Sequence, residues 1–419
     1  MSGRSTVPGS KSLTNRALVA AALGEGTSRV TGALAGDDAE AMVGGLTALG
    51  VEITPRGPGA FDVTGSAGRV GLRPAVVDAR LAGTALRFLT AVAALGGGGI
   101  TVTGEEALRR RPVGALLEAL RACGAEVSGS GPAGDLAPVA VGRRRRPLGG
   151  PVAVDASASS QFVTALLLVA PLFEEPLALE ARGLSASGFV ELTTELMERF
   201  GVEVDHEPGG SRWRVPARTP YRARDYAVPP DASAASHLFT LGLATGGTVT
   251  VEGLFSARLQ PDFSVLGIFE RLGAEVDEHG DGAVTVAAPS HLVPVEVDLG
   301  AMPDQLPNVA VLAALAEGTS RIGGVGITRF HETDRMAAVA VELGKAGVAC
   351  ELSADEVVVH GGSPRGGATF ASHGDHRMAM ALAALAAAAG GCRIEEAAAV
   401  TKTYRDFWAD AAALGLVWG

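Results

Sequence analysis

The chain has 419 residues, of which 47% are hydrophobic and 19% charged, a composition typical of globular proteins rather than disordered ones. A chain of this length is too long for one ordinary core and predicts two or three domains. The formal net charge of −11 argues against nucleic acid as a partner, because proteins that bind polyanions usually carry a basic face. If the ligand is an anion, its positive contacts must be gathered locally.

The cysteines, the N-terminus and the longest apolar run favour a cytoplasmic protein. Cys123, Cys350 and Cys392 match no metal-ligand or redox spacing, so we expect no metal site. The N-terminus has no apolar segment typical of a secretion signal. The apolar run at 378–389 is too short to cross a bilayer, and we expect no membrane partner.

Residues 8–16, Pro-Gly-Ser-Lys-Ser-Leu-Thr-Asn-Arg, are followed at once by an apolar helical run at 17–23. This pattern predicts a turn that leads into a helix, with Lys11, Ser12 and Arg16 in or near its first turn. Unpaired backbone N–H groups and the helix dipole favour anions at such an end. The stretch therefore favours a carboxylate or phosphate site. A capped helix whose Lys and Arg face water stays open as the alternative.

One structural unit recurs six times along the chain. Each copy has an apolar helix, a short alternating strand after small residues, and a second helix that closes on Gly-Val-Glu or a variant. Gly at each closure suits the left-handed conformation common at helix C-termini. The predicted strands are 26–30, 99–102, 175–179, 247–251, 318–322 and 391–394. The period of roughly 70 residues suits an α/β module that is used several times.

Residues 205–230 are rich in Pro, Gly and Arg and divide the six copies three and three. We expect two α/β domains of similar architecture with a ligand cleft between them. An elongated, non-catalytic repeat scaffold that binds a partner protein is the alternative. The charged motifs that distinguish the copies argue against it.

Charged motifs stand at corresponding places in the later copies, most of them at predicted helix starts. They lie at 109–112, 157–161, 302–304, 331–335, 375–378 and 401–403. Helix N-termini that converge would give an anion site in an acidic protein. Each motif also has a plain structural reading, such as Asp304 as a helix cap or Glu332 with Arg335 as a surface ion pair. The basic run at 143–146 is expected to be a solvated loop.

In order, and over essentially the whole chain, these motifs resemble the enolpyruvyl transferase family. The resemblance rests on Pro-Gly-Ser-Lys-Ser at 8–12 with Asn15 and Arg16, Ala-Gly-Thr at 82–84 with Arg87, Arg-Pro at 111–112, Ser-Ser-Gln-Phe at 159–162, Pro-Asp at 303–304, Glu-Thr-Asp-Arg at 332–335, Asp-His-Arg-Met-Ala-Met at 375–380, and Lys402.

The resemblance implies a fold of six βαβαββ units, an inside-out α/β barrel type, in two similar domains. It also implies a crossover that returns the N-terminus to the second domain. Residues 11–220 would then form the first domain, and residues 1–10 with 221–419 the second.

The branch of the family that acts on shikimate 3-phosphate is the nearest match. Its reaction moves the enolpyruvyl group of phosphoenolpyruvate to the 5-hydroxyl of that acceptor and releases phosphate, through a tetrahedral intermediate and without a cofactor. This is a step toward chorismate and the aromatic amino acids. By resemblance Asp304 faces the hydroxyl, while Glu332, helped by Lys11, serves the methylene carbon as an acid. The expected partners are the two small-molecule substrates, and a monomer is expected.

The resemblance also assigns the anion contacts. Bidentate guanidinium groups suit the carboxylate of phosphoenolpyruvate, and the implied clamp is Arg335 with Arg377. Other contacts implied for phosphoenolpyruvate are Lys11, Gly83, Arg111, Gln161 and Lys402, with Gly83 leaving room for the ligand. Those implied for the acceptor are Lys11, Ser12, Arg16, Ser159, Ser160, Gln161, Asp304 and His331.

Several positions around the acceptor depart from the family's pattern. Leu81 stands where Asn is common, Ala186 and Phe189 where Ser and a Tyr or His are common, and Ile327 and His331 where Asn and Lys are common. The departures put the acceptor in question rather than the reaction.

Two of the departures have possible replacements. Ser185 or Ser187 could replace the missing serine through a one-residue shift, and a protonated His331 could contact an anion. An enzyme of the family with another hydroxylated acceptor, in specialised metabolism, stays open. The relative that acts on UDP-N-acetylglucosamine is disfavoured, because it typically has a Cys before its Arg-Pro motif and residues 104–112 contain none.

Overall fold

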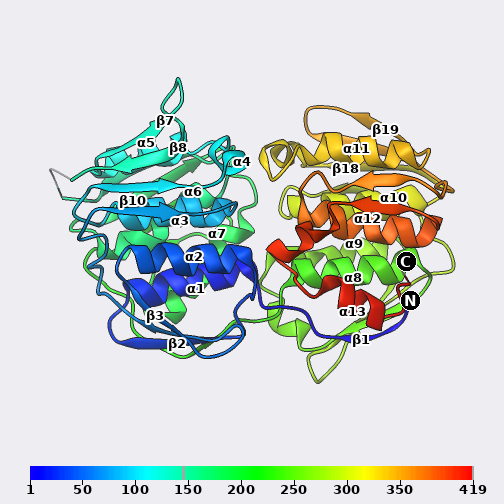
Figure 1. The fold of residues 1–419 in the computed structure, drawn as a ribbon, viewed down its shortest axis with the longest axis horizontal. Helices are drawn as coiled ribbons and strands as arrows, with labels where there is room; N and C mark the ends of the chain where they lie inside the picture. Colours follow the sequence, from blue (N-terminus) through cyan, green and yellow to red (C-terminus); the bar gives the residue numbers. More distant parts are fainter. Residues whose placement is uncertain (144–146, 418–419) are drawn as a thin grey trace. The chain divides into compact units, whose positions relative to one another are not determined.

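The computed structural model describes residues 1–143 and 147–417, so most of the basic run at 143–146 lies outside the described residues. The chain forms two compact units (Figure 1). The first unit is Gly9–Val228, and the second is Met1–Pro8 together with Pro229–Gly419.

The strands of the first unit form three four-stranded sheets, and each sheet has one parallel pair and two antiparallel pairs of strands. Their orders are β13-β2-β4-β3, β5-β6-β8-β7 and β11-β12-β10-β9. The strands are β2 (Thr27–Thr31), β3 (Glu52–Pro55), β4 (Phe61–Thr64), β5 (Ala75–Asp78), β6 (Ile100–Thr103), β7 (Val127–Ser130), β8 (Leu136–Val141), β9 (Gly150–Asp155), β10 (Leu177–Arg182), β11 (Asp205–His206), β12 (Arg212–Val215) and β13 (Tyr226–Ala227). The helices are α1 (Lys11–Leu23), α2 (Asp37–Ala48), α3 (Gly83–Ala93), α4 (Glu106–Arg109), α5 (Gly114–Cys123), α6 (Gln161–Val169), η1 (Ala170–Leu172) and α7 (Gly188–Arg199).

The second unit repeats this pattern with two four-stranded sheets, β1-β14-β16-β15 and β17-β18-β20-β19, and the parallel pair β21-β22. Its strands are β1 (Gly3–Ser5), β14 (Thr248–Val251), β15 (Glu275–Glu278), β16 (Val284–Ala287), β17 (Glu296–Asp298), β18 (Gly318–Gly323), β19 (Ala349–Leu352), β20 (Glu356–Gly361), β21 (Thr369–Ala371) and β22 (Arg393–Glu395). Its helices are α8 (Ala232–Ala244), η2 (Leu254–Ala257), η3 (Pro261–Ser264), α9 (Val265–Arg271), η4 (Pro303–Gln305), α10 (Leu306–Leu315), η5 (Gly326–Phe330), α11 (Arg335–Lys345), α12 (His376–Ala389), η6 (Ala397–Lys402) and α13 (Phe407–Ala413). All six strands predicted from the repeat are present.

Two repeats take their first strand from a distant part of the chain. Strand β13 pairs in parallel with β2, so that Tyr226 lies opposite Val30. Strand β1 pairs in parallel with β14, so that Gly3 lies opposite Val249. The N-terminal strand thus belongs to the second unit, which is the crossover that the sequence predicted.

Residues 205–230, the Pro-, Gly- and Arg-rich gap between the two groups of copies, contain three short strands, β11, β12 and β13. Strand β12 alternates exposed arginines with buried Trp213 and Val215, and Tyr221 is buried and donates a hydrogen bond from its hydroxyl to the Leu168 carbonyl oxygen at 2.9 Å. The predicted boundaries are 10/11 and 220/221, whereas the compact units divide at 8/9 and 228/229. A hairpin with one solvated face can be rich in Arg and Gly, so the composition of residues 205–230 alone did not indicate that they form strands.

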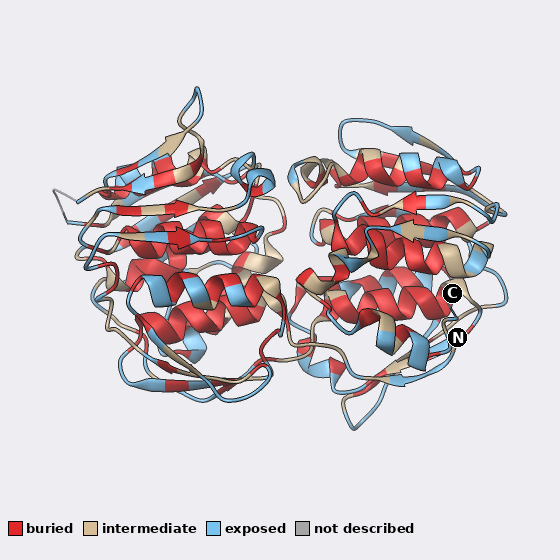
Figure 2. Ribbon diagram, viewed as in Figure 1, coloured by how far each residue is buried: buried red, intermediate tan, exposed pale blue. Residues whose placement is uncertain are grey.

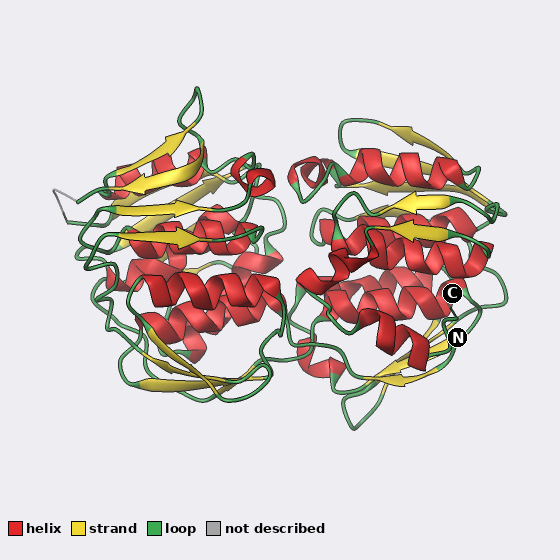
Figure 3. Ribbon diagram, viewed as in Figure 1, coloured by secondary structure: helices red, strands yellow, loops and turns green. Residues whose placement is uncertain are grey.

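Each unit is built around three helices that are buried on nearly every side. They are α1, α3 and α6 in the first unit and α8, α10 and α12 in the second (Figure 2). Helices that are apolar all round are expected in a core, and their many alanines allow close packing. The helices of each unit pack against one another, while the sheets lie at the outside of each unit (Figure 3). The polar motifs at 8–16, 82–87, 159–161 and 375–378 precede or occupy the first turns of α1, α3, α6 and α12.

Candidate active site

In the first unit, the start of α1 holds a buried arginine whose hydrogen-bond acceptors are uncharged groups. Arg16 donates from Nε to the Thr193 hydroxyl at 2.8 Å, from Nη1 to the Ser12 carbonyl oxygen at 2.9 Å and from Nη2 to the Phe189 carbonyl oxygen at 2.9 Å. Burial lowers the pKa of Arg16 to about 9. Among the described residues no carboxylate forms an ion pair with it. A buried guanidinium held by neutral acceptors favours an anionic ligand, because burying an uncompensated charge is costly.

Lys11 and Ser12 lie at the same helix start. Ser10 caps α1, since its hydroxyl accepts a hydrogen bond from the Leu13 amide at 3.4 Å. Lys11 forms an ion pair with Asp38 at 3.6 Å. The helix start is therefore capped and has a cation beside it, an arrangement that is compatible with an anion, and the anion site at this helix stays a prediction.

The starts of α3 and α6 lie close together in the first unit. Arg87 donates from Nη1 to Gln161 Oε1 at 2.6 Å, and its guanidinium carbon lies 5.2 Å from the centroid of the Phe162 ring. A Cβ added at Gly83 would lie 2.6 Å from Arg111 Nη1. The space that the absent side chain leaves at Gly83 is therefore occupied by Arg111 in this structure.

Ser159 and Ser160, just before α6, are both largely buried, and Ser159 accepts a hydrogen bond from the Gln161 amide at 3.2 Å. A contact of 3.4 Å from Arg16 Nη2 to the Thr164 hydroxyl links α1 to α6. The predicted acceptor residues of the first unit therefore lie on neighbouring helices.

The turn before α7 carries the departures predicted to affect the acceptor. Ala186 is buried and has a left-handed backbone with φ of 51°. The hydroxyl oxygen of Ser185 is buried and has no hydrogen-bond partner among the described residues. Phe189 supplies its backbone carbonyl to Arg16. Ser187 lies just before the first residue of α7, so Ser185 is the better candidate for the missing serine.

In the second unit, Arg335 lies fully buried among three carboxylates. Its Nε donates to Asp375 Oδ2 at 2.7 Å, its Nη1 to Asp304 Oδ1 at 2.6 Å and its Nη2 to Glu332 Oε2 at 2.9 Å. Asp375 is itself fully buried and caps α12, accepting the Arg377 amide at 2.8 Å. The contact of Asp375 with Arg335 was not predicted from the sequence, although the position of Asp375 just before a helix was a usable signal.

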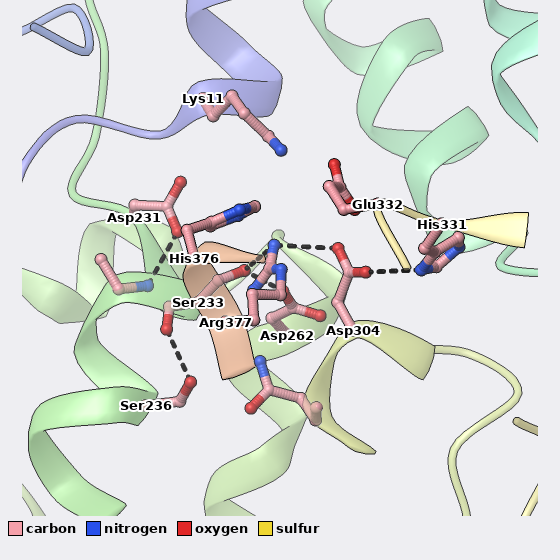
Figure 4. Close-up of polar contacts among 12 residues, drawn as sticks. Lys11, Asp231, Ser233, Ser236, Asp262, Asp304, His331, Glu332, His376 and Arg377 are labelled. Atoms are coloured by element: carbon pink, nitrogen blue, oxygen red, sulfur yellow. Dashed lines mark hydrogen bonds and ion pairs between the residues drawn. The ribbon is translucent and has the colours of Figure 1, made fainter. Parts of the chain in front are cut away.

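Asp304 is held between two arginines and a histidine. Its Oδ2 lies 2.8 Å from Arg377 Nη2, and its Oδ1 lies 3.3 Å from His331 Nδ1 (Figure 4). Burial opposes ionisation of Asp304, but Arg377, Arg335 and His331 outweigh it and hold the pKa of its carboxyl well below the usual range. Burial lowers the pKa of His331 despite the nearby Asp304. The ring is therefore neutral near pH 7, not the protonated form considered from the sequence.

Glu332 is held by two cations. Its Oε1 lies 2.8 Å from Lys402 Nζ, and its Oε2 accepts from Arg335. Lys402 itself is largely buried. The second unit thus brings together every residue that the sequence predicted from its own part of the chain: Asp304, His331, Glu332, Arg335, Arg377 and Lys402.

Most of the chain matches a family of known proteins. A family model for EPSP synthase (3-phosphoshikimate 1-carboxyvinyltransferase) matches residues 1–410. The chain belongs to the EPSP synthase family. A 3-phosphoshikimate 1-carboxyvinyltransferase from Methanosphaerula palustris is 38% identical over 418 residues, which cover 98% of this chain and 96% of that protein.

Solved structures of the same family share the fold. An EPSP synthase from Acinetobacter baumannii has a TM-score of 0.81 at 24% identity and covers 99% of this chain and 96% of its own. The enolpyruvyl transferase NikO from Streptomyces tendae has a TM-score of 0.74 at 20% identity and covers 99% and 94%. These likenesses confirm the predicted α/β fold of two similar domains, and the fold alone does not distinguish between the two enzymes.

The EPSP synthase family consists of transferases that act on small molecules, so the predicted enzyme class is confirmed. Its members serve aromatic amino-acid biosynthesis, as the sequence predicted. Within the part of the chain that the structure describes, no helix is both long and apolar enough to span a bilayer.

Proposed function

We propose that this EPSP synthase family member transfers the enolpyruvyl group of phosphoenolpyruvate to the 5-hydroxyl of shikimate 3-phosphate by using Asp304 and Glu332 as its acid–base pair. The observation that carries the proposal is the pair of carboxylates held by buried cations in the second unit. Addition to a vinyl carbon needs one group to take the hydroxyl proton and another to protonate the methylene.

Each carboxylate lies between two cations, so the division of roles between them rests on the resemblance to the family. Asp304, which the arginines keep ionised, is the group that we assign to the hydroxyl proton. Glu332, between Lys402 and Arg335, is the group that we assign to the methylene carbon. Lys11 assists this step by resemblance to the family.

Arg335 and Arg377 are the proposed contacts for the carboxylate of phosphoenolpyruvate. The Nε, Nη1 and Nη2 of Arg335 all donate to carboxylates of the protein. A substrate carboxylate at the Nη groups must therefore displace Asp304 or Glu332. Such an exchange would free the acid–base groups at the moment the substrate binds. Lys11, Gly83, Arg111, Gln161 and Lys402 remain the proposed contacts for the rest of that substrate.

The first unit supplies the proposed acceptor contacts. Buried Arg16, which lacks an acidic partner among the described residues, suits a carboxylate. Ser159, Ser160 and Gln161 at the start of α6 suit a phosphate. Lys11, Ser12, Asp304 and His331 complete the proposed acceptor set, with His331 acting as a neutral ring.

We further propose a cytoplasmic monomer that has no nucleic-acid or membrane partner and needs no cofactor or metal. The net charge of −11 supports the absence of a polyanion partner.

The test is phosphate release from phosphoenolpyruvate with a panel of acceptors. We expect turnover with shikimate 3-phosphate and much weaker turnover with shikimate, which lacks the phosphate that the α6 site would bind. Better turnover of an acceptor without the 3-phosphate would favour the alternative, an enolpyruvyl transferase with another hydroxylated acceptor. That alternative draws on Ala186 and Phe189, which lack the polar side chains common in the family.

Ala186→Ser is expected to lower the KM for shikimate 3-phosphate by about tenfold or more, because a hydrogen bond to a charged group contributes about 1.5–3 kcal/mol and each 1.4 kcal/mol is about tenfold. Steady-state kinetics with varied acceptor measures the effect. Ala186→Gly is the matched control, since it relieves the left-handed backbone (φ of 51°) without adding a hydroxyl.

The companion variant Ser185→Ala is expected to raise the same KM by several-fold, if Ser185 has taken over the missing contact. An unchanged KM would show that Ser185 does not contact the acceptor. Equal effects of Ala186→Ser and Ala186→Gly would show that the backbone, rather than a hydroxyl, limits binding.

A further inference from the structure

Asp262 is a buried carboxyl group that the proposed mechanism does not use. It lies in η3 and is only 2% exposed. Its Oδ2 accepts a hydrogen bond from the Ser233 hydroxyl, and its Oδ1 has no hydrogen-bond partner among the described residues. Ser233 also accepts from Arg377 Nη2 at 3.4 Å (Figure 4). A chain of contacts therefore leads from Asp262 through Ser233 to Arg377.

Arg377 is flanked by acidic groups on more than one side. Asp304 forms an ion pair with it at 2.8 Å, and the charges of Asp262 and Asp231 also act on it. Asp304 stays ionised, whereas burial raises the pKa of Asp262 to about 6, against the opposing charge of Arg377. Of the two carboxyl groups beside this arginine, Asp262 is the one that titrates near neutral pH.

Negative groups outnumber positive ones in this part of the second unit. The permanent cations are Arg335, Arg377 and Lys402, and the carboxyl groups around them are Asp231, Asp262, Asp304, Glu332 and Asp375. A substrate carboxylate adds a further negative charge in a poorly hydrated site. Like charges at short range raise the pKa of the group that is easiest to protonate.

We propose that Asp262 is a positioning residue for Arg377 whose carboxyl group takes up a proton when the carboxylate of phosphoenolpyruvate binds that arginine. The proton comes from water and forms an O–H bond on the carboxyl of Asp262. No other bond changes. Once Asp262 is neutral, its charge no longer competes with the ligand for the positive charge of Arg377. Ser233 keeps its hydrogen bond to the protonated carboxyl group. The inference rests on the proposed function of Arg377.

Charged groups on three neighbouring elements act on Asp262. They include Arg377 of α12, Asp304 of η4 and Asp231 at the cap of α8. On α8 itself, burial lowers the pKa of His237 to about 3, so that ring stays neutral. Helix α9 carries Glu270 and Arg271, which are exposed at its other end. The buried ring of His376 on α12 lies in the same cluster (Figure 4), with Nδ1 3.7 Å from Asp375. Because His376 is the same in the wild type and in Asp262→Asn, a comparison of these two proteins reports on Asp262.

The test compares kcat/KM for phosphoenolpyruvate in the wild type and in Asp262→Asn, at saturating shikimate 3-phosphate, from pH 5.5 to 8.5. The amide is neutral like the protonated acid and can still accept from Ser233. The ratio of variant to wild type is expected to be near one at pH 5.5 and to rise to about tenfold above pH 7.5, as it would if binding made the acid about ten times harder to ionise. The ionisation of the substrate phosphate cancels in this ratio. The change is expected in KM, with kcat altered less than about twofold.

Asp277→Asn, which changes an exposed aspartate on β15, is the matched control and is expected to give a flat ratio near one. A flat ratio for Asp262→Asn in an active enzyme would overturn this inference and leave the proposed function standing. Absence of phosphate release by the wild type at every pH would overturn the proposed function instead, and this inference with it.

A second measurement counts the protons directly. Titration with phosphoenolpyruvate alone, in lightly buffered solution at pH 7, is expected to show that the wild type takes up a fraction of a proton more for each molecule bound than Asp262→Asn does. The phosphate of the ligand, which itself titrates near this pH, contributes equally to both proteins. Equal proton counts while both proteins bind the ligand would overturn the inference, and Asp262→Ser gives the same comparison if Asp262→Asn fails to fold.

Discussion

Replacing Arg335 by alanine is expected to lower the free energy of unfolding of the second unit by about 3–5 kcal/mol, because breaking a buried ion pair leaves uncompensated charge. Arg335 is the shared partner of Asp304, Glu332 and Asp375. Urea unfolding followed by circular dichroism measures the loss. The expected effect is larger than the loss of a substrate contact alone, which is what the sequence predicted for this residue.

The loss should also depend on pH. The pKa of Asp304 is depressed in the folded protein, so its contribution to stability is present above its unfolded pKa of about 3.9 and is lost as the pH falls. The difference between wild type and variant should therefore shrink below about pH 4. Arg321→Ala, which removes an exposed ion pair with Glu356, is the control and should cost under about 1 kcal/mol. If Arg335→Ala cost no more than this control, the buried cluster would not stabilise the fold.

Glu332→Gln is expected to reduce kcat by about 10²–10⁴-fold, the range typical of losing a general acid. The amide keeps the size of the side chain and can still accept a hydrogen bond from Lys402 or Arg335. The Kd of phosphoenolpyruvate should change much less than kcat. Single-turnover kinetics with saturating substrates, together with a binding titration, separates the two quantities.

Glu356→Gln serves as the control for Glu332→Gln, because Glu356 is partly exposed at the first residue of β20 and forms its ion pair with exposed Arg321. Its kcat should stay within about twofold of the wild type. Near-normal turnover of Glu332→Gln would remove Glu332 from the proposed chemistry and leave Asp304 as the remaining candidate.

The fold was largely predictable because a repeat amplifies a weak local signal. Each copy presents the same helix, strand and helix closure, so six approximate matches located strands that one match could not. The boundary predicted within residues 205–230 was misplaced for a physical reason. The buried side chains of Trp213 and Tyr221 are single residues within a polar sequence, and their burial depends on strands far away in the chain.

The site was predictable where a residue precedes or begins a helix and carries charge, as with Lys11 and Asp304. The contacts between residues far apart in the sequence were not predictable. Nothing in the sequence indicates that Arg335 would be shared by three carboxylates, or that Asp262 would lie near Arg377 (Figure 4). Glu332 is only three residues from Arg335, and that spacing did suggest the pair. The other contacts join residues about 30 to 115 positions apart, and sequence spacing carries no information about them.

The first unit is continuous in the sequence, whereas the second unit takes one strand, β1, from the N-terminus. Gly9–Val228 is one continuous stretch that contains every strand of its sheets, including β13. Pro229–Gly419 is also continuous, but the strand β1 that completes its first sheet lies at the other end of the chain. A gene cut after residue 228 would thus yield one fragment that contains all the strands of its sheets and one fragment that lacks β1. In the second fragment the edge of β14 would be unpaired, and unpaired strand edges promote aggregation. Fusing Met1–Pro8 ahead of Pro229 would restore that edge, so a split version of this enzyme requires a permuted second half.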